Sequence, residues 1–314
     1  MEIRVFSISY FVYLAIFIVA LVVLTKFLKT KSPEFNKRFI SGLLFFALFI
    51  HFSKLLFPPY VNSELALKKI TPENICALST LAFPFIFLSK NKYLKDYMFY
   101  MGLISGTLAI VFPAEAFGKS PFIYDTIRFY IAHMTITIAP FLMVSTGLHK
   151  LDYHRVYCVG VIFLGVMAVI LINEIILIEI GLVDISETPE GKLLTDPFRY
   201  RNFSFIFGPV LGYFYDNNIT LLQDFFDVLI PNFAMTIPYG EFSGEKKYWP
   251  IIWAIVPVMI LVTFVSFLIS IYWEKEHMKK DWVIVKKYFK RTFNPKKYFL
   301  EEEQEKQQSE ELII

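Results

Sequence analysis

The chain lacks the residue patterns of disulfide-rich, metal-dependent and serine-hydrolase proteins. Only two cysteines, Cys76 and Cys158, occur in 314 residues. Two cysteines at such dissimilar positions form no disulfide framework and no CxxC pair for zinc. The sequence also contains no HExxH metal motif and no GxSxG nucleophile elbow. We therefore expect no metal site and no cofactor.

Charged residues are also scarce, which excludes an ordinary soluble domain. Asp, Glu, Lys and Arg make up 19% of the chain, against about 25% in soluble proteins. Hydrophobic residues make up 56%, and the mean hydropathy is +0.52. The sequence therefore predicts a multi-pass protein of the cell membrane with an all-α fold.

Seven apolar stretches predict membrane-spanning helices of the length that a bilayer core of about 30 Å requires. They cover residues 5–28, 39–57, 73–89, 97–113, 123–147, 156–181 and 248–273. Lys and Arg gather after the first, third and fifth stretches and again beyond residue 273, and these four segments share one side of the membrane. Because basic loops face the cytoplasm, we expect the N-terminus outside and the C-terminus inside. Residues 1–273 then form the transmembrane domain, and residues 274–314 form a charged cytoplasmic tail.

Two segments outside the spans carry their own predictions. Residues 182–247 lie outside the cell and include two interrupted apolar stretches, 203–215 and 221–235. These stretches are either interfacial amphipathic helices or a re-entrant pair that lines a cavity. The tail sequence KKDWVIVKKYFKRTFNPKKYF is basic and aromatic. It predicts binding to anionic lipid, and no nucleic acid is expected as a partner.

Polar residues of four spans fall at a similar depth, in the half of the bilayer near the outer surface. Ionisable residues inside a membrane are costly and mark functional sites by default. Their shared depth therefore predicts one polar site, although Lys54 could simply extend its ammonium to the interface. The residues are His51, Lys54, Glu73, Asn74, Cys76, Asp125, Arg128, His133, Asn173, Glu174 and Glu179.

Cys76 lies near the start of the third span. Thr71 is a candidate N-cap and Pro72 a candidate first helical residue. The unpaired amides and the positive end of the helix dipole favour a reactive thiolate there. The same amides, with Asn74, could hold an oxyanion. The alternative is that Cys76 is only a small buried hydrophobic residue.

His133 lies in the fifth span, five residues after Arg128 and thus roughly 7.5 Å deeper. Cys76 lies at a similar depth, so the two side chains meet if the third and fifth spans are neighbours. A cysteine and a histidine base are the minimum set for acyl transfer through a thioester. Thr137, one turn further along, could orient the imidazole. The alternative is a histidine that only satisfies a neighbouring helix.

The remaining candidates have two interpretations each. His51 is either a second acid, base or orienting group, or a packing residue. Arg128 could bind a phospholipid phosphate, because its planar fork matches phosphate geometry, or it could pair with Asp125 at the interface. Glu174 and Asn173 could line the cavity or balance the charge of Arg128.

Two motifs carry a resemblance to a known family. NIC (74–76) and FYIAHMTITIAP (129–140) resemble segments of the YwaF-type bacterial membrane proteins and of their eukaryotic relatives, the transmembrane protein 164 acyltransferases. In that family the reactive cysteine and histidine are about 57 residues apart, as Cys76 and His133 are here. Asn74 matches the asparagine of the eukaryotic members, and Asn202 in YRNFSFIF (200–207) matches a further family asparagine.

The resemblance implies a membrane acyltransferase. Cys76 would take an acyl chain from a membrane phospholipid as a thioester, with His133 as the base and Asn202 near the substrate. The acceptor at the outer leaflet would be a lysolipid or the amino group of a lipoprotein. The alternatives are a transporter and a non-catalytic lipid-binding membrane protein.

Overall fold

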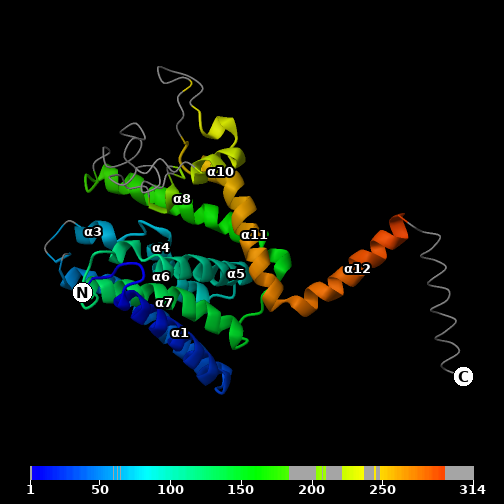
Figure 1. The fold of residues 1–314 in the computed structure, drawn as a ribbon, viewed down its shortest axis with the longest axis horizontal. Coiled ribbons are helices and arrows are strands. Elements are labelled where there is room, and N and C mark those ends of the chain that lie inside the picture. The colour runs from blue at the N-terminus through cyan, green and yellow to red at the C-terminus, as the bar shows by residue number, and fades with distance from the viewer. Residues whose placement is uncertain are drawn as a thin grey trace, which may run out of the picture. The chain divides into compact units, whose positions relative to one another are not determined.

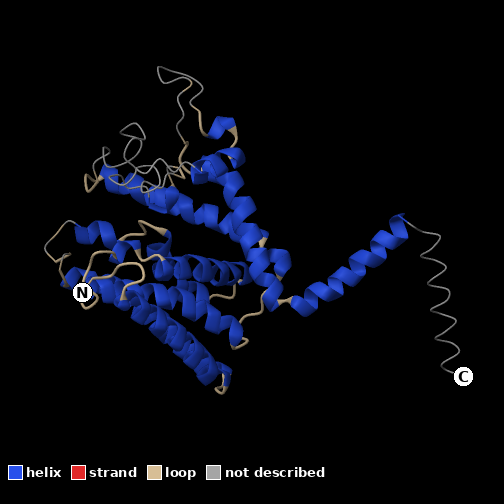
Figure 2. Ribbon diagram, in the orientation of Figure 1, coloured by secondary structure: helices blue, strands red, loops and turns tan. Residues whose placement is uncertain are grey.

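Helices joined by loops make up the part of the chain that its computed structural model describes (Figures 1 and 2). Within the described residues, six helices are long and apolar enough to cross a membrane, which confirms the predicted all-α membrane fold. The described residues are 2–58, 60–61, 63, 65–183, 203–206, 208–209, 221–236, 244 and 248–293.

Up to Glu179 the described elements are helices that follow one another along the chain. The α-helices are α1 (Ile8–Lys29), α2 (Pro33–Phe52), α3 (Leu65–Ile70), α4 (Ile75–Leu88), α5 (Lys92–Met101), α6 (Thr107–Val111), α7 (Tyr124–Ser145), α8 (Tyr157–Glu179), α10 (Leu221–Leu229), α11 (Ile255–Trp273) and α12 (Lys275–Phe293). The 3₁₀ turns are η1 (Ser53–Leu56), η3 (Ala114–Ala116), η4 (Tyr153–Arg155), η7 (Phe203–Phe205), η8 (Asn232–Ala234) and η9 (Ile252–Ala254), and η2 (Gly102–Gly106) is a π-helix.

The third predicted span forms the short helix α4 and begins later than expected. Its N-cap is Asn74, whose side chain accepts a hydrogen bond from the amide of Ala77, so the prediction of Thr71 as N-cap and Pro72 as first residue was wrong. The hydroxyl of Thr71 instead donates to the carbonyl of Lys68 in α3. With 14 residues, α4 rises only about 21 Å, less than the thickness of a bilayer core.

Helix α7 is the most enclosed of the spanning helices. It contacts α1, α2, α4, α5, α6 and η2 (Figure 1). Of the 18 residues in the apolar stretch of α7, 72% are buried inside the protein, whereas in α1 the corresponding share is 11%. The charged and polar residues of α7 are therefore shielded by protein, whereas α1 exposes most of its apolar surface, as a lipid-facing helix does.

The π-helix η2 allows α5 to pass close to α7. Gly102 and Gly106 face the α7 backbone, and a Cβ atom at Gly102 would lie 2.5 Å from the carbonyl oxygen of Ile136. Only glycine fits such a close approach. Single π turns are frequent at functional sites, and this one lies beside the segment of α7 that carries His133.

The predicted segment 182–247 is described only in part. The stretch 221–235 is not one helix, because α10 ends at Leu229, just before Pro231, and the turn η8 follows. Of the stretch 203–215, the structure describes the turn η7 and a few neighbouring residues, and Asn202 lies outside the described residues. Residues 1–266 and 267–314 form two compact units by their internal contacts, and the predicted basic tail contains α12.

Candidate functional site

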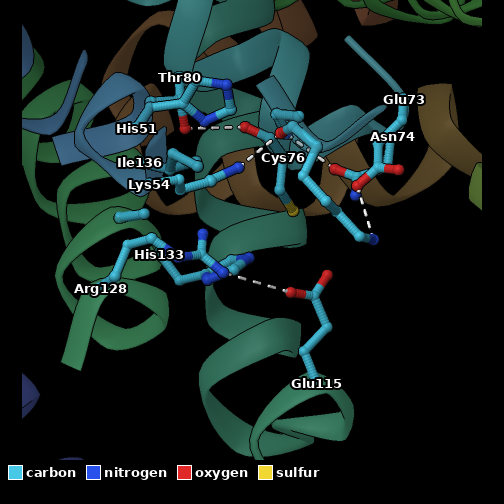
Figure 3. Close-up of a pocket in the computed structure, with 13 residues that line it drawn as sticks. His51, Lys54, Glu73, Asn74, Cys76, Thr80, Glu115, Arg128, His133 and Ile136 are labelled. Atoms are coloured by element: carbon cyan, nitrogen blue, oxygen red, sulfur yellow. Dashed lines mark hydrogen bonds and ion pairs between the residues drawn. The ribbon is translucent and has the colours of Figure 1, made fainter. Parts of the chain in front are cut away.

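A cavity in the first unit gathers most of the predicted polar residues (Figure 3). Its walls come from α2 with η1, from α3, α4 and the connection between them, from η3 and from α7. Segments that are up to 85 positions apart in the sequence thus meet at one place. The lining residues are His51, Lys54, Lys69, Glu73, Asn74, Cys76, Ala77, Thr80, Glu115, Arg128, Ala132, His133 and Ile136.

Cys76 lies in the first turn of α4 and lines this cavity. The amide of Ala77 donates to the side-chain oxygen of Asn74 over 2.8 Å, and the amide of Ile75 donates to the hydroxyl of Ser204 over 2.9 Å. The amide of Cys76 lies between them, and within the described part of the chain it has no hydrogen-bond acceptor. It is therefore available to an oxygen atom of a bound molecule.

Ser204 is a contributor to the site that the sequence did not reveal. It belongs to η7 and holds a left-handed backbone conformation with φ 59°. This conformation is uncommon for a residue other than glycine, and such strain often marks functional segments. Ser204 caps the helix that carries Cys76 across 129 positions of sequence, a distance that no local pattern predicts.

Residue Cys76 is half-buried, and its thiol lies near the hydroxyl of Ser105 of η2. The hydroxyl of Ser105 in turn donates to the carbonyl of Met101 over 2.7 Å. Cys158, in contrast, lies at the start of α8 and is not among the cavity-lining residues. Of the two cysteines, Cys76 is thus the one that lines this cavity within the described part of the chain.

His133 lies on the same cavity as Cys76, so the structure brings the predicted pair together (Figure 3). The ring is buried, and its Nδ1 lies 2.7 Å from the carbonyl oxygen of Phe129 one turn earlier in α7. A carbonyl only accepts, so Nδ1 carries the proton and Nε2 of the neutral ring is an acceptor. This is the tautomer that a general base requires.

Thr137 does not orient the imidazole, as the sequence had suggested. Its hydroxyl donates to the carbonyl of His133 over 3.1 Å and lies 3.4 Å from the carbonyl of Gly102. The group that holds the His133 ring is instead the backbone carbonyl of Phe129. Thr137 stabilises the contact between α7 and η2.

Arg128 lines the cavity and pairs with Asp125, as one of its two interpretations expected. Two of its nitrogens lie 2.9 Å and 3.2 Å from Oδ1 of Asp125. Asp125 further accepts hydrogen bonds from Lys119 over 2.5 Å and from Tyr60 over 2.7 Å. Burial and then the bond to Asp125 raise the pKa of Tyr60, which stays a donor at neutral pH. Asp125 therefore fixes the guanidinium at the cavity edge.

His51 and Lys54 extend the site from α2 and η1. The Nε2 atom of His51 lies 3.0 Å from the carbonyl of Ile70 and donates to it. Lys54 does not reach to the interface, as the sequence allowed, because its side chain is buried and donates to the carbonyl of Lys69 over 2.6 Å. Glu115, in the turn η3, is a cavity residue without any sequence signal, since it follows an apolar stretch in a short loop.

Asn173 and Glu174 are not among the described residues that line the cavity, contrary to the expectation. The amide nitrogen of Asn173 donates to the hydroxyl of Thr71 over 3.1 Å. This bond joins α8 to the segment that leads into α4. Glu174 is fully buried in α8. Asn173 thus supports the segment that leads into the site. Asn202, for which a substrate-binding role was predicted, lies outside the described residues.

Comparison with known proteins gives one match. The model of the TMEM164 family matches residues 5–215, a range that includes every residue of the cavity. No curated protein and no solved structure matches the chain significantly.

Proposed function

The chain belongs to the TMEM164 family of membrane proteins, and from this premise we propose that it is a membrane-embedded acyltransferase of the cell membrane. Cys76 is the nucleophile and His133 the general base and acid. The donor is a membrane phospholipid, and the acceptor at the outer leaflet is a lysolipid or the amino group of a lipoprotein.

The observation that supports this proposal is the joint placement of Cys76 and His133 on one cavity, with the imidazole held in a single tautomer. The Phe129 carbonyl binds the proton on Nδ1 and leaves Nε2 to accept a proton. A nucleophile, a base and a third group that orients the base are the common arrangement of covalent catalysis. Here the orienting group is a backbone carbonyl, which is fixed by the helix itself.

In the first half-reaction the thiol proton of Cys76 moves to Nε2 of His133, and the sulfur attacks the ester carbonyl of the phospholipid. The tetrahedral oxyanion accepts a hydrogen bond from the amide of Cys76, which has no acceptor of its own within the described residues. The C–O ester bond then breaks, and His133 returns its proton to the departing lysolipid oxygen. The acyl chain remains on Cys76 as a thioester.

The second half-reaction reverses these roles toward the acceptor. His133 takes the proton from the acceptor's hydroxyl or amine, whose oxygen or nitrogen attacks the thioester carbonyl. The C–S bond breaks, and the sulfur of Cys76 regains the proton from His133. No atom is oxidised or reduced in either step, so the residues named here suffice for the reaction.

A labelled acyl donor tests the proposal. The purified full chain is incubated with phosphatidylcholine that carries a radiolabelled acyl chain, and the protein is analysed for a hydroxylamine-labile adduct. Wild type and Cys158→Ser should form the adduct, and Cys76→Ala should not. An adduct that survives Cys76→Ala refutes the assignment of the nucleophile. No adduct on wild type would favour a transporter or a non-catalytic lipid-binding protein.

A further inference from the structure

Lys54 is a buried ammonium group that forms no ion pair within 4.0 Å with a carboxylate of the described residues. The residue is 3% exposed, and its Nζ donates one hydrogen bond, to the carbonyl oxygen of Lys69 over 2.6 Å. An ammonium carries three N–H donors. The group lines the cavity that contains Cys76 (Figure 3), so its remaining donors are available on that side.

The other cations of the cavity wall already have anionic partners. Lys69 lies 2.8 Å from a carboxylate oxygen of Glu73. Arg128 lies 2.9 Å from Asp125 and 3.9 Å from Glu115.

The lining therefore carries one positive charge in excess, with both histidines neutral. Its cations are Lys54, Lys69 and Arg128, and its carboxylates are Glu73 and Glu115. Asp125 and Lys119 form an ion pair next to the cavity, and including both leaves the excess unchanged because their charges cancel. Among the described lining residues, Lys54 is the cation that forms no ion pair within 4.0 Å.

A buried charge is costly unless it is paired and hydrogen-bonded. An anion that enters the cavity offsets that cost, and a phosphodiester carries one negative charge, equal to the excess. We propose that Lys54 binds a phosphate oxygen of the headgroup of the phospholipid donor and thereby sets the preference for phospholipid over neutral esters. This inference rests on the proposed acyltransferase function and assigns its main phosphate-binding group.

Lys54 is better placed for this role than Arg128, to which the sequence pointed. Nε and one terminal nitrogen of Arg128 are bound to Asp125, so its fork is not free for a bidentate phosphate contact. Arg128 then contributes a positive charge at the cavity edge, and Lys54 supplies the N–H groups that bind the phosphate oxygen.

Two acyl donors separate this role from a role in the chemistry. The rate of acylation of Cys76 is measured with phosphatidylcholine and with a neutral p-nitrophenyl ester of the same acyl chain. The proteins are the full-length wild type, Lys54→Met, Lys54→Arg and the control Lys37→Met. Lys37 lies in α2, the helix that leads into the turn η1 with Lys54, but it is exposed and is not among the residues that line the cavity.

Loss of one charge-assisted hydrogen bond should lower kcat/KM of Lys54→Met for phosphatidylcholine by about 10- to 100-fold. Its rate with the neutral ester should stay within about threefold of wild type, since that donor has no phosphate to lose. Lys54→Arg should recover most of the phosphatidylcholine rate, and Lys37→Met should match wild type with both donors. Replacing a buried cation by an apolar side chain of similar volume is often tolerated, so Lys54→Met should fold.

Three results would overturn the inference. Equal loss with both donors would assign Lys54 to the chemistry or to the fold, and an unchanged rate with both would assign it no role. If Lys54→Met fails to fold, full phosphatidylcholine activity in Lys54→Gln overturns the inference instead. A wild type that neither donor acylates contradicts the proposed function itself, and the inference falls with it.

Helix α12 carries an independent second inference, from its own surface. Met278, Trp282, Val285, Phe289 and Phe293 are spaced by three or four residues and so share one face. The last four are 59%, 40%, 56% and 75% exposed.

The rest of α12 is strongly basic. Residues 275–293 contain seven Lys or Arg and two Asp or Glu, and cations such as Lys279, Lys280 and Lys287 lie away from the apolar face. A positively charged helix with an aromatic stripe binds anionic lipid surfaces. We infer that α12 lies on an anionic membrane surface with Trp282 and Phe289 inserted between the headgroups.

A polarity-sensitive dye on α12 tests this inference. The dye is attached to Phe289→Cys in full-length protein with Cys76→Ala and Cys158→Ser, in nanodiscs of phosphatidylcholine with or without phosphatidylglycerol. The dye emission should shift to the blue in the anionic discs, and the added changes Lys286→Glu and Lys287→Glu should abolish the shift. An equal emission in both discs refutes the electrostatic binding, and a shift that grows with protein concentration indicates a second copy of the chain as the partner.

Discussion

Gly106 offers a sharp test of how the fold positions His133. An alanine Cβ at this position of η2 would fall inside van der Waals contact of the Thr137 hydroxyl and 3.0 Å from the carbonyl oxygen of His133. Thr137 could rotate away only by giving up its hydrogen bond to the same carbonyl. The backbone of α7 would therefore have to move at the residue that carries the proposed base.

The structure sets the size of the effect. Overpacking of a closely packed contact costs about 1–3 kcal/mol, so Gly106→Ala should lower the free energy of unfolding by that amount. A displacement of a catalytic group by 1 Å can cost about 100-fold in rate, so acylation of Cys76 should fall by about 10- to 100-fold. The matched control is Gly165→Ala in α8, where a Cβ meets no atom within 4 Å.

The assay combines thermal unfolding in detergent with the rate of acylation of Cys76 by labelled phosphatidylcholine. Gly165→Ala should match wild type in both, or gain slightly in stability from its better helix propensity. Adding Thr137→Ala to Gly106→Ala removes the nearest clashing atom, so the double variant should recover part of the lost stability by coupling of about 0.5–3 kcal/mol. If Gly106→Ala is as stable and active as Gly165→Ala, the close contact does not position His133.

Three further predictions concern other parts of the first unit. Cys76→Ala should keep its unfolding temperature and its yield from the membrane, because it removes one small side chain from a half-buried residue; loss of the protein would show a packing role instead. Asp125→Asn leaves a buried guanidinium with a weaker partner, and should cost about 3–5 kcal/mol in chemical unfolding; an unchanged midpoint would contradict the role of that carboxylate. Partial burial acts to raise the pKa of Asp152, but hydrogen bonds from His154 and the charge of Arg155 lower the pKa below its ordinary value. The associated stability is therefore present above about pH 4 and is lost as the pH falls below it; unfolding temperatures between pH 6 and pH 3 should show that loss in wild type but not in Asp152→Asn, and identical curves would contradict the assignment.

The class of the fold and the position of the site could be predicted from the sequence. Apolar runs of bilayer length predict spanning helices without knowledge of their contacts. The cost of a polar group in lipid made His51, Cys76, Arg128 and His133 informative, and all four line one cavity. These predictions depend on composition and depth, which each helix encodes alone.

The errors concern contacts between segments that are distant in the sequence. Thr71 and Pro72 match a helix start by local rules, but Asn74 takes the N-cap and Ser204 completes it from 129 positions away. Asn173 was placed at the depth of the site, but its side chain bonds Thr71 and does not line the cavity. The depth of a residue in the membrane follows from its own helix. The direction in which its side chain points depends on which helices pack against it, and one sequence does not reveal those neighbours.

Lys54 was underestimated for a related reason. A lysine near the end of an apolar span usually extends its ammonium to the interface. Here the helix α3 and the connection to α4 cover it, and the carbonyl of Lys69 binds its ammonium. Only the fold shows that this charge is buried and faces the cavity of Cys76.

The central claim is that the imidazole of His133 activates the thiol of Cys76. The most direct measurement is the rate at which phosphatidylcholine acylates Cys76 in a single turnover, compared between wild type and His133→Ala at matched folded concentration. Loss of a positioned general base should slow this step by about 10²- to 10⁴-fold. An acylation rate that is the same in both proteins would contradict the account.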